Sequence, residues 1–135
     1  MRALDTNVLA RFFVDDADDA QAAKQRPAAI AALAERSFVS VTVLLELEWV
    51  LRGAYKIERA TILKALLGVL GLPNVIAEDS ARIAAALRDY EAGLDFADAL
   101  HLARSARASG FATFDQRLAK RAKGLALTPP VELLV

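Results

Sequence analysis

Four acidic residues stand where apolar segments of the chain begin or are interrupted. They are Asp5 in M-R-A-L-D-T-N, Glu46 in V-T-V-L-L-E-L-E-W-V-L-R, Asp98 in G-L-D-F-A-D-A-L-H, and Asp115 directly after F-A-T-F. Carboxylates that converge repel one another unless a cation is bound between them. Oxygen ligands favour hard ions, and Mg²⁺ or Mn²⁺ fits best because such an ion keeps positions open for water and phosphate oxygens.

Composition excludes several other chemistries. The 135-residue chain has no cysteine and a single histidine, His101, so disulfides, thiolate catalysis and zinc sites with several Cys or His ligands are excluded. Its 17 basic and 17 acidic residues balance to a formal charge of zero, so the total charge does not indicate a nucleic-acid partner. Asp5 interrupts the first apolar run and no later run is long enough to span a bilayer, which predicts a soluble, cytoplasmic protein.

Apolar runs of strand length alternate with stretches of helical periodicity. We expect strands at residues 2–4, 37–41, 74–77, 111–114 and 125–128, and helices at residues 7–14, 17–35, 43–52, 58–69, 80–90, 95–108 and 116–122. Pro27 should kink or split the second helix, and Thr42 can cap the third, which Gly53 can end. This alternation predicts a single α/β domain, residues 1–135, with a short parallel sheet flanked by helices on both faces.

Asp5 and Asp115 each follow an expected strand. Ligands of open parallel sheets bind beyond the carboxyl ends of the strands, so the two acids point into one crevice if their strands are neighbours. Each acid also directly precedes an expected helix, where aspartate is a favoured cap. That structural alternative stays open for both residues.

Two glutamates interrupt the apolar helix expected at 43–52. Glu48 has Arg52 four residues further on, and a solvated ion pair explains it. Glu46 shares its face with Val43 and Trp49 and has no local basic partner, so a buried carboxylate there is costly unless something binds it. A distant arginine is the structural alternative to a metal ion.

Asp95 and Asp98 lie three residues apart at the start of a helix. The simplest interpretation is a capping pair, with Asp95 as the N-cap and Asp98 in the first turn, facing along the helix toward Leu102. His101 lies one turn beyond Asp98 and can be its hydrogen-bond partner, although a lone histidine beside apolar residues is more often structural.

Charge is unevenly distributed along the chain. Residues 99–124 hold six basic residues against Asp115 alone, and residues 15–19 form an acidic counterpart. Both patterns are common on solvated helix faces and helix ends. The basic residues are Arg104, Arg107, Arg117, Lys120, Arg121 and Lys123.

Four segments, in this order and at these separations, resemble the PIN-domain ribonucleases, most closely the VapC-type toxins of bacterial toxin–antitoxin pairs. They are L-D-T-N-V-L, V-S-V-T-V-L-L-E-L-E-W-V-L, D-F-A-D-A-L-H-L-A-R and F-A-T-F-D-Q-R-L, and they span nearly the whole chain. The resemblance implies a three-layer α/β/α fold with its active site at the carboxyl ends of the strands.

The resemblance also implies roles for individual residues. Asp5 and Asp98 correspond to the principal ligands of Mg²⁺ or Mn²⁺, and Glu46 and Asp115 complete the acidic quartet directly or through water. The supporting residues are Thr6 and Asn7 beside the first acid, Thr113 beside the last, and Asp95 as a less secure member of its pair.

The implied activity is hydrolysis of RNA, mostly structured RNA such as tRNA, by a metal-activated water. Arg104, Arg107, Arg117, Lys120 and Arg121 become candidates for contact with RNA phosphates. A homodimer and an inhibitory antitoxin are expected from the resemblance alone.

The sequence also allows two rival functions. Haloacid-dehalogenase-like phosphatases also place an aspartate after the first strand, but they need a second aspartate where this chain has Asn7. A non-catalytic PIN-like module that binds RNA or protein would be indicated by a missing acid, and none is missing.

Overall fold

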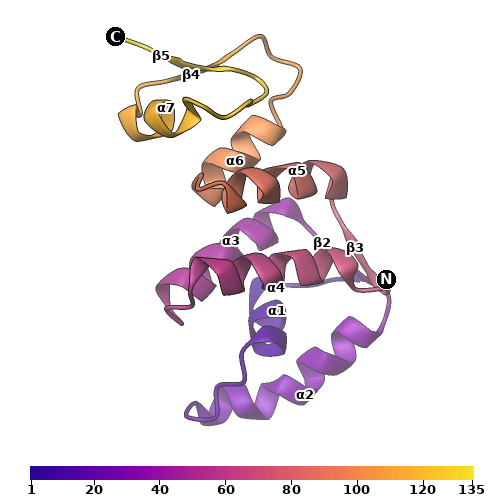
Figure 1. Cartoon of the computed structure of the whole chain (residues 1–135). Helices are drawn as coiled ribbons and strands as arrows, with labels where there is room; N and C mark the ends of the chain where they lie inside the picture. Colours follow the sequence, from indigo (N-terminus) through magenta and orange to yellow (C-terminus); the bar gives the residue numbers. More distant parts are fainter. The chain divides into compact units, whose positions relative to one another are not determined.

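The structure of the protein, a computed structural model, describes residues 1–135 (Figure 1). It divides into two compact units, which we call unit 1 (Met1–Ser80) and unit 2 (Ala81–Val135). Each unit is described by itself.

Unit 1 is a three-stranded parallel sheet with helices between its strands. The strand order is β1-β2-β3, and Ser37 of β2 is in register with Arg2 on one side and Val75 on the other. The elements follow one another as β1 (Arg2–Ala3), α1 (Thr6–Phe13), α2 (Ala20–Ala34), β2 (Ser37–Val39), α3 (Val41–Gly53), α4 (Arg59–Gly71) and β3 (Val75–Ala77). Because the strands are parallel, the residues that follow β1, β2 and β3 meet at one edge of the sheet.

The core of unit 1 is aliphatic. Fully buried leucines and isoleucine come from α1, α3 and α4, namely Leu9, Leu44, Leu47, Leu51, Ile62 and Leu66. The α3 residues recur at spacings of three and four, which places them on one face of that helix. Helices α3 and α4 lie side by side in Figure 1.

Unit 2 begins with helices and ends with a small sheet. Its elements are α5 (Ser80–Glu91), α6 (Phe96–Ala103), β4 (Phe111–Thr113), α7 (Gln116–Ala122) and β5 (Val131–Leu133). β4 and β5 pair in parallel, with Phe111 opposite Val131. Tyr90 and Phe96 are both buried, and their rings meet edge to face with centroids 5.5 Å apart.

The predicted fold class is confirmed: short parallel sheets are flanked by helices in an α/β fold. The strands of Asp5 and Asp115 are not hydrogen-bonded neighbours, since β1 pairs with β2 and β4 pairs with β5.

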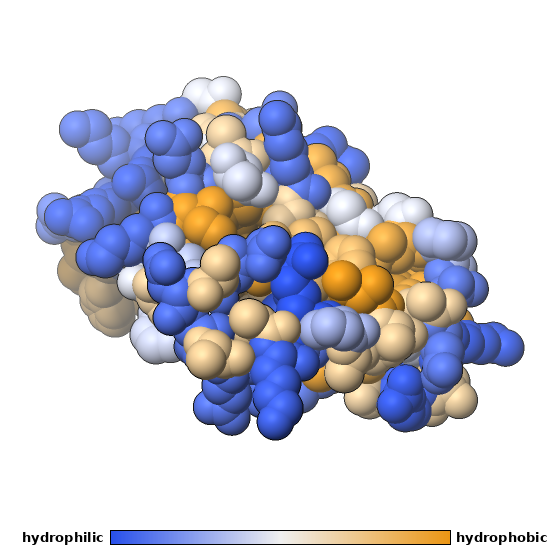
Figure 2. Space-filling model, turned by 90° about the horizontal axis from the view of Figure 1, so that it is seen from below, coloured by the Kyte–Doolittle hydropathy of each residue, from blue (hydrophilic) through white to orange (hydrophobic).

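Figure 2 shows one face of the molecule, on which hydrophilic residues are interspersed with apolar ones. No helix has the length and apolar character needed to cross a membrane.

Two predictions about helices were wrong, and a third was wrong in that α2 does not split at Pro27. Helix α2 is continuous through Pro27, which is exposed, so the carbonyl group left without its usual donor can be hydrated. Ser40 rather than Thr42 caps α3, because its hydroxyl accepts from the Val43 N–H at 3.3 Å. Helix α6 ends at Ala103 instead of reaching residue 108, with Arg104 as its C-cap.

The last predicted strand was also misplaced. Residues 125–128 form no strand, and β5 lies beyond the two prolines, at Val131–Leu133. The Pro130 carbonyl accepts a hydrogen bond from the Phe111 N–H at 2.9 Å, so the pairing with β4 begins directly at the second proline. Proline lacks an N–H but retains its acceptor, which is sufficient at the start of a strand.

Candidate active site

Asp5 follows β1 and caps α1. Its backbone is extended and its Oδ1 accepts a hydrogen bond from the Thr6 N–H at 2.8 Å, so the capping role is real. The carboxylate is exposed and its Oδ2 makes no hydrogen bond. The hydroxyl of Thr6 is buried without a hydrogen-bond partner, while Asn7 is exposed.

The burial of the two glutamates of α3 is the opposite of what the sequence predicts. Glu46 is exposed, and Trp49, on its side of the helix, is 64% exposed. Glu48 is only 2% exposed and belongs to the buried stripe that also contains Leu44 and Leu51. The predicted ion pair exists, with Arg52 Nε 2.9 Å from Glu48 Oε2, but its carboxylate is not solvated.

Because Glu46 is exposed, burial of its charge is no longer a reason for a bound cation. A carboxylate in water needs no compensating partner, so the argument that Glu46 must bind a cation to be tolerated does not hold. Glu46 is the sixth residue of α3, which begins one residue after β2, so it still lies within two helical turns of the carboxyl edge of the unit 1 sheet.

Glu78 is a residue at this edge that sequence reasoning missed. It follows β3, and its Oε1 accepts the Val41 N–H, the first of α3, at 2.9 Å, while its own N–H donates to the Val39 carbonyl. Four N–H groups at a helix start lack partners within the helix, and here Glu78 and Ser40 supply acceptors. The position of Glu78 after an apolar run resembles that of Asp5, and that pattern is the signal that could have identified it.

In unit 2, Asp95 caps α6 and accepts the Asp98 N–H at 3.3 Å, as predicted for the capping pair. Asp98 is half-buried in the first turn. Burial, and then the carboxylates of Asp95 and Asp115, raise the pKa of Asp98, while His101 and Arg121 partly oppose that rise. The carboxylates of Asp95 and Asp115 are therefore close enough to act electrostatically on that of Asp98.

Asp115 joins β4 to α7. Its Oδ1 accepts the N–H groups of Arg117 and Leu118 at 2.9 and 3.1 Å, so it caps α7. Thr113 Oγ1 accepts the Asp115 N–H at 2.9 Å and orients the backbone at this acid. The carboxylate is exposed and its Oδ2 makes no hydrogen bond.

The other predicted residues of unit 2 lie on the surface. His101 is exposed and stacks on Phe111, with ring centroids 6.4 Å apart and planes 14° apart. The basic candidates are exposed at the C-cap of α6, in the turn that follows it and on α7, namely Arg104, Arg107, Arg117, Lys120 and Arg121. Arg121 acts on the carboxyl group of Asp98, so this part of the basic segment lies beside the acids.

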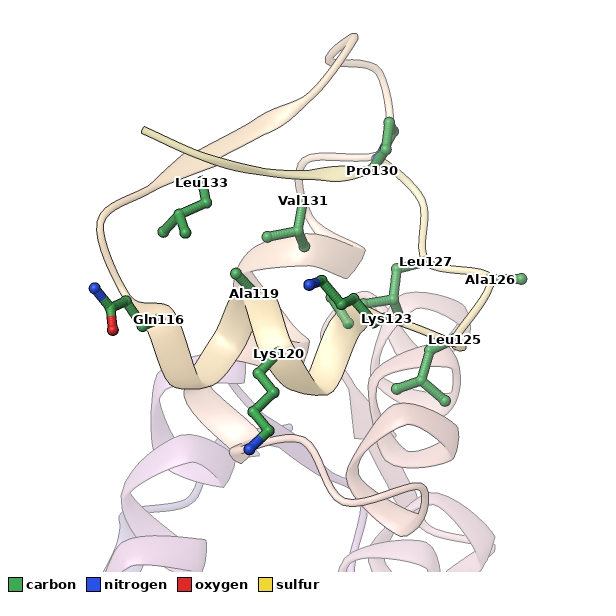
Figure 3. A pocket seen from close by; sticks show the side chains of 11 residues that line it. Gln116, Ala119, Lys120, Lys123, Leu125, Ala126, Leu127, Pro130, Val131 and Leu133 are labelled. Atoms are coloured by element: carbon green, nitrogen blue, oxygen red, sulfur yellow. The ribbon is translucent and has the colours of Figure 1, made fainter. Parts of the chain in front are cut away.

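A pocket of about 790 Å³ lies between α7 and the chain that returns to β5. Figure 3 shows Val131 and Leu133 extending from β5 toward α7. Leu125 and Leu127 make the wall apolar, and Lys120 and Lys123 are the charged residues among its lining. No acidic residue lines this pocket, so it is separate from the carboxylates.

The predicted quartet is divided between the units: Asp5 and Glu46 belong to unit 1, and Asp98 and Asp115 to unit 2. Asp98 and Asp115 interact electrostatically, together with Asp95. No group of three or more His, Asp or Glu side chains in the structure is arranged to hold a metal ion.

Comparison with known proteins identifies the family. The sequence matches the PIN domain family over residues 2–124, and the chain therefore belongs to that family. No curated protein and no solved structure matches. The PIN domain is a nuclease-type fold, generally of ribonucleases that use divalent metal ions, and the match includes all four acids.

The chain's own groups fit a divalent hard cation. Asp5 and Asp115 each keep one carboxylate oxygen free of hydrogen bonds, and Asp98 accepts none through its side chain. The buried Thr6 hydroxyl beside Asp5 has no partner and is an oxygen ligand or water acceptor of the right chemistry. A cation beside Asp98 would also offset the like charges that raise its pKa.

Proposed function

We propose that the protein is an endoribonuclease that depends on Mg²⁺ or Mn²⁺, and that Asp5, Glu46, Asp98 and Asp115 form one acidic site. In this proposal residues 1–135 act as a single PIN domain. The observation that carries the proposal is the family match, which runs through every one of the four acids. The mutual action of Asp95, Asp98 and Asp115 supports it further.

Each residue has a defined task. Asp5 and Asp98 would hold the cation, and the chemistry that the ion would supply when bound is activation of water and compensation of charge on the scissile phosphate. Glu46 or Asp115 orients the attacking water and accepts its proton, a task for which their exposed carboxylates are accessible. Thr113 and Asp95 are positioning residues, because they act through hydrogen bonds to Asp115 and Asp98.

The basic residues of unit 2 bind the substrate in this proposal. Arg104, Arg107, Arg117, Lys120 and Arg121 contact phosphates beside the acids and supply affinity that does not depend on base sequence. Structured RNA such as tRNA is the proposed substrate class.

We further propose that the protein is the toxin of a VapC-type toxin–antitoxin pair. It would act in the cytoplasm as a homodimer and be held inactive by a cognate antitoxin. The support for this finer assignment is the set of four sequence segments that resemble such toxins.

The decisive experiment measures cleavage of a total tRNA pool by the protein with Mg²⁺, with Mn²⁺ and with EDTA, alongside Asp5→Asn. We expect cuts at discrete sites that need the metal and that disappear in the variant. A folded wild type that binds Mg²⁺ but cuts neither tRNA nor ribosomal RNA would contradict the proposal. The non-catalytic PIN-like module would then be favoured, and RNA binding without cleavage would identify it.

A further inference from the structure

A groove of about 360 Å³ runs between α1 and α2 within unit 1. Arg2, Asn7 and Arg11 line one side, and Gln25 and three alanines of α2 line the other. The small alanine side chains leave the groove open, and no acidic residue lines it. The groove is therefore lined by positive and neutral groups only.

Arg11 is held in place by neutral partners. Its Nε donates to Gln25 Oε1 at 3.1 Å and its Nη1 donates to Tyr55 Oη at 2.7 Å. No carboxylate forms a salt bridge with it, whereas Arg2 pairs with Glu35 at 3.1 Å. Arg11 is half-buried as a residue, and no opposite charge compensates its guanidinium.

Arg11 lies on α1, the helix that is capped by Asp5 of the candidate active site. Asn7 and Arg11 are four residues apart on α1 and therefore lie on one face of that helix, one turn from each other. Asn7 is two residues beyond Asp5, at the helix start. The groove thus extends along α1 from the vicinity of Asp5 to a fixed, uncompensated guanidinium.

We propose that Arg11 binds a phosphate of the RNA strand next to the phosphate that is cleaved at Asp5. The α1–α2 groove is then a subsite for the RNA backbone, and this assignment rests on the proposed ribonuclease function. A planar guanidinium presents paired N–H groups that match two phosphate oxygens. The hydrogen bonds to Gln25 and Tyr55 fix its orientation before the strand arrives, which lowers the entropy cost of binding.

The test measures binding of a fluorescently labelled single-stranded RNA by anisotropy, in EDTA and at several salt concentrations. We expect Arg11→Gln to weaken binding about tenfold, as for the loss of a charged hydrogen-bond contact. The slope of log K against log salt should fall in magnitude by about 0.7, since one phosphate contact is lost on a single strand.

The matched control is Arg36→Gln. Arg36 is exposed and directly precedes β2, at the opposite, amino edge of the sheet from Asp5. The variant loses the same charge from the same unit, so we expect wild-type affinity and slope. An equal loss in both variants would overturn the proposal, because it would show that only total charge matters.

Two further variants separate charge from orientation. Arg11→Lys keeps the charge and should keep the salt slope while binding less tightly, and Tyr55→Phe should do the same by freeing the guanidinium. They also keep the test decisive if Arg11→Gln fails to fold, which thermal unfolding of each variant would reveal. Unchanged affinity in all three variants would overturn the proposal.

The outcomes distinguish this subsite from the proposed function. Metal-dependent cleavage by the wild type with RNA binding that ignores Arg11 would overturn the subsite alone. Binding that depends on Arg11 without any cleavage would leave the subsite in place and refute hydrolysis. If a polyglutamate peptide bound through Arg11 and RNA did not, the groove would be a site for an acidic protein and the proposal would be wrong.

Discussion

The two units carry their acids in different electrostatic settings. In unit 2, Asp95, Asp98 and Asp115 act on one another, and together with burial they raise the pKa of Asp98. In unit 1, Asp5 and Glu46 are both exposed to solvent. Close carboxylates are expected where a cation compensates them, so the surroundings of Asp98 agree with its proposed role as a metal ligand.

The comparison also separates structural acids from candidate catalytic ones. Glu48 of unit 1 and Asp89 of unit 2 are acids outside the quartet, and both are shielded from water, Glu48 fully and Asp89 partly. Burial raises the pKa of Asp89, against the opposing effect of Arg88. Shielding of an acid from water therefore does not by itself distinguish a candidate catalytic acid from a structural one.

The largest expected effect distinguishes the two perturbed aspartates of unit 2. Asp98→Asn should lower the rate of RNA cleavage by more than about a hundredfold, because loss of a metal ligand exceeds the usual cost of losing an outer hydrogen bond. Asp89→Asn should leave cleavage unchanged. Single-turnover kinetics on the same RNA measure both, and equal losses would mean that burial rather than ligation makes Asp98 important.

The next effect distinguishes the two glutamates of α3. Glu48→Gln should lower the free energy of unfolding by about 1–3 kcal/mol, since the buried side chain loses a charge-assisted hydrogen bond to Arg52. Glu46→Gln should change it by less than about 0.5 kcal/mol, as for other exposed sites, while reducing cleavage. Urea unfolding measures the free energy of unfolding of both variants, and an RNA cleavage assay measures the activity of both. A stability loss in Glu46→Gln would contradict its exposed position.

A smaller effect distinguishes the helix-capping role of Asp115 from its proposed role in RNA cleavage. Asparagine is as good a cap as aspartate but lacks the charge, whereas alanine lacks both. Asp115→Ala should therefore cost about 1 kcal/mol of stability, and Asp115→Asn close to none. Both variants should lose cleavage activity. Full activity in Asp115→Asn would reduce this residue to a helix cap.

The smallest effect is a pH dependence of the metal-free protein. Because the pKa of Asp98 is raised in the folded state, its protonation contributes stability that is present below its ordinary pKa of 3.8 and is lost as the pH rises through the raised value. Asp98→Asn should then be more stable than the wild type at neutral pH, and this advantage should shrink in acid. Urea unfolding at neutral and acidic pH measures the difference.

Addition of Mg²⁺ sharpens the same experiment. The ion should stabilise the wild type at neutral pH and remove the advantage of Asp98→Asn. Asp89→Asn gains stability at neutral pH by the same reasoning but should respond to Mg²⁺ as the wild type does. Stabilisation of Asp98→Asn by Mg²⁺ equal to that of the wild type would contradict ligation by Asp98.

Local sequence signals predicted the elements whose ends are marked by capping residues. Helix α7 was predicted with its observed bounds, because Asp115 caps its start and the periodicity stops at its end. β5 was misplaced since residues 125–128 are apolar enough for a strand, and only the pairing with β4 decides which segment forms one. Such pairing is a long-range property that a local pattern does not contain.

In the candidate site, too, local motifs were predicted from the sequence and long-range contacts were not. The family resemblance identified the four acids from their motifs, and the family match covers each of them. Which face of α3 is buried was predicted wrongly, because both faces carry apolar residues and the packing of Leu44 and Leu51 decides between them. The capping role of Glu78 was missed since its partner, Val41, lies 37 residues away in sequence.

The bond from Glu78 to the Val41 N–H has a consequence for local unfolding. Amides at helix starts usually fray and exchange rapidly with solvent, because they have no acceptor within the helix. Here the first amide of α3 is tied to the residue that follows β3. Opening of the start of the helix that carries Glu46 therefore also requires the loss of this bond to the residue after β3, so we expect slower exchange of the Val41 amide than is usual for the first amide of a helix.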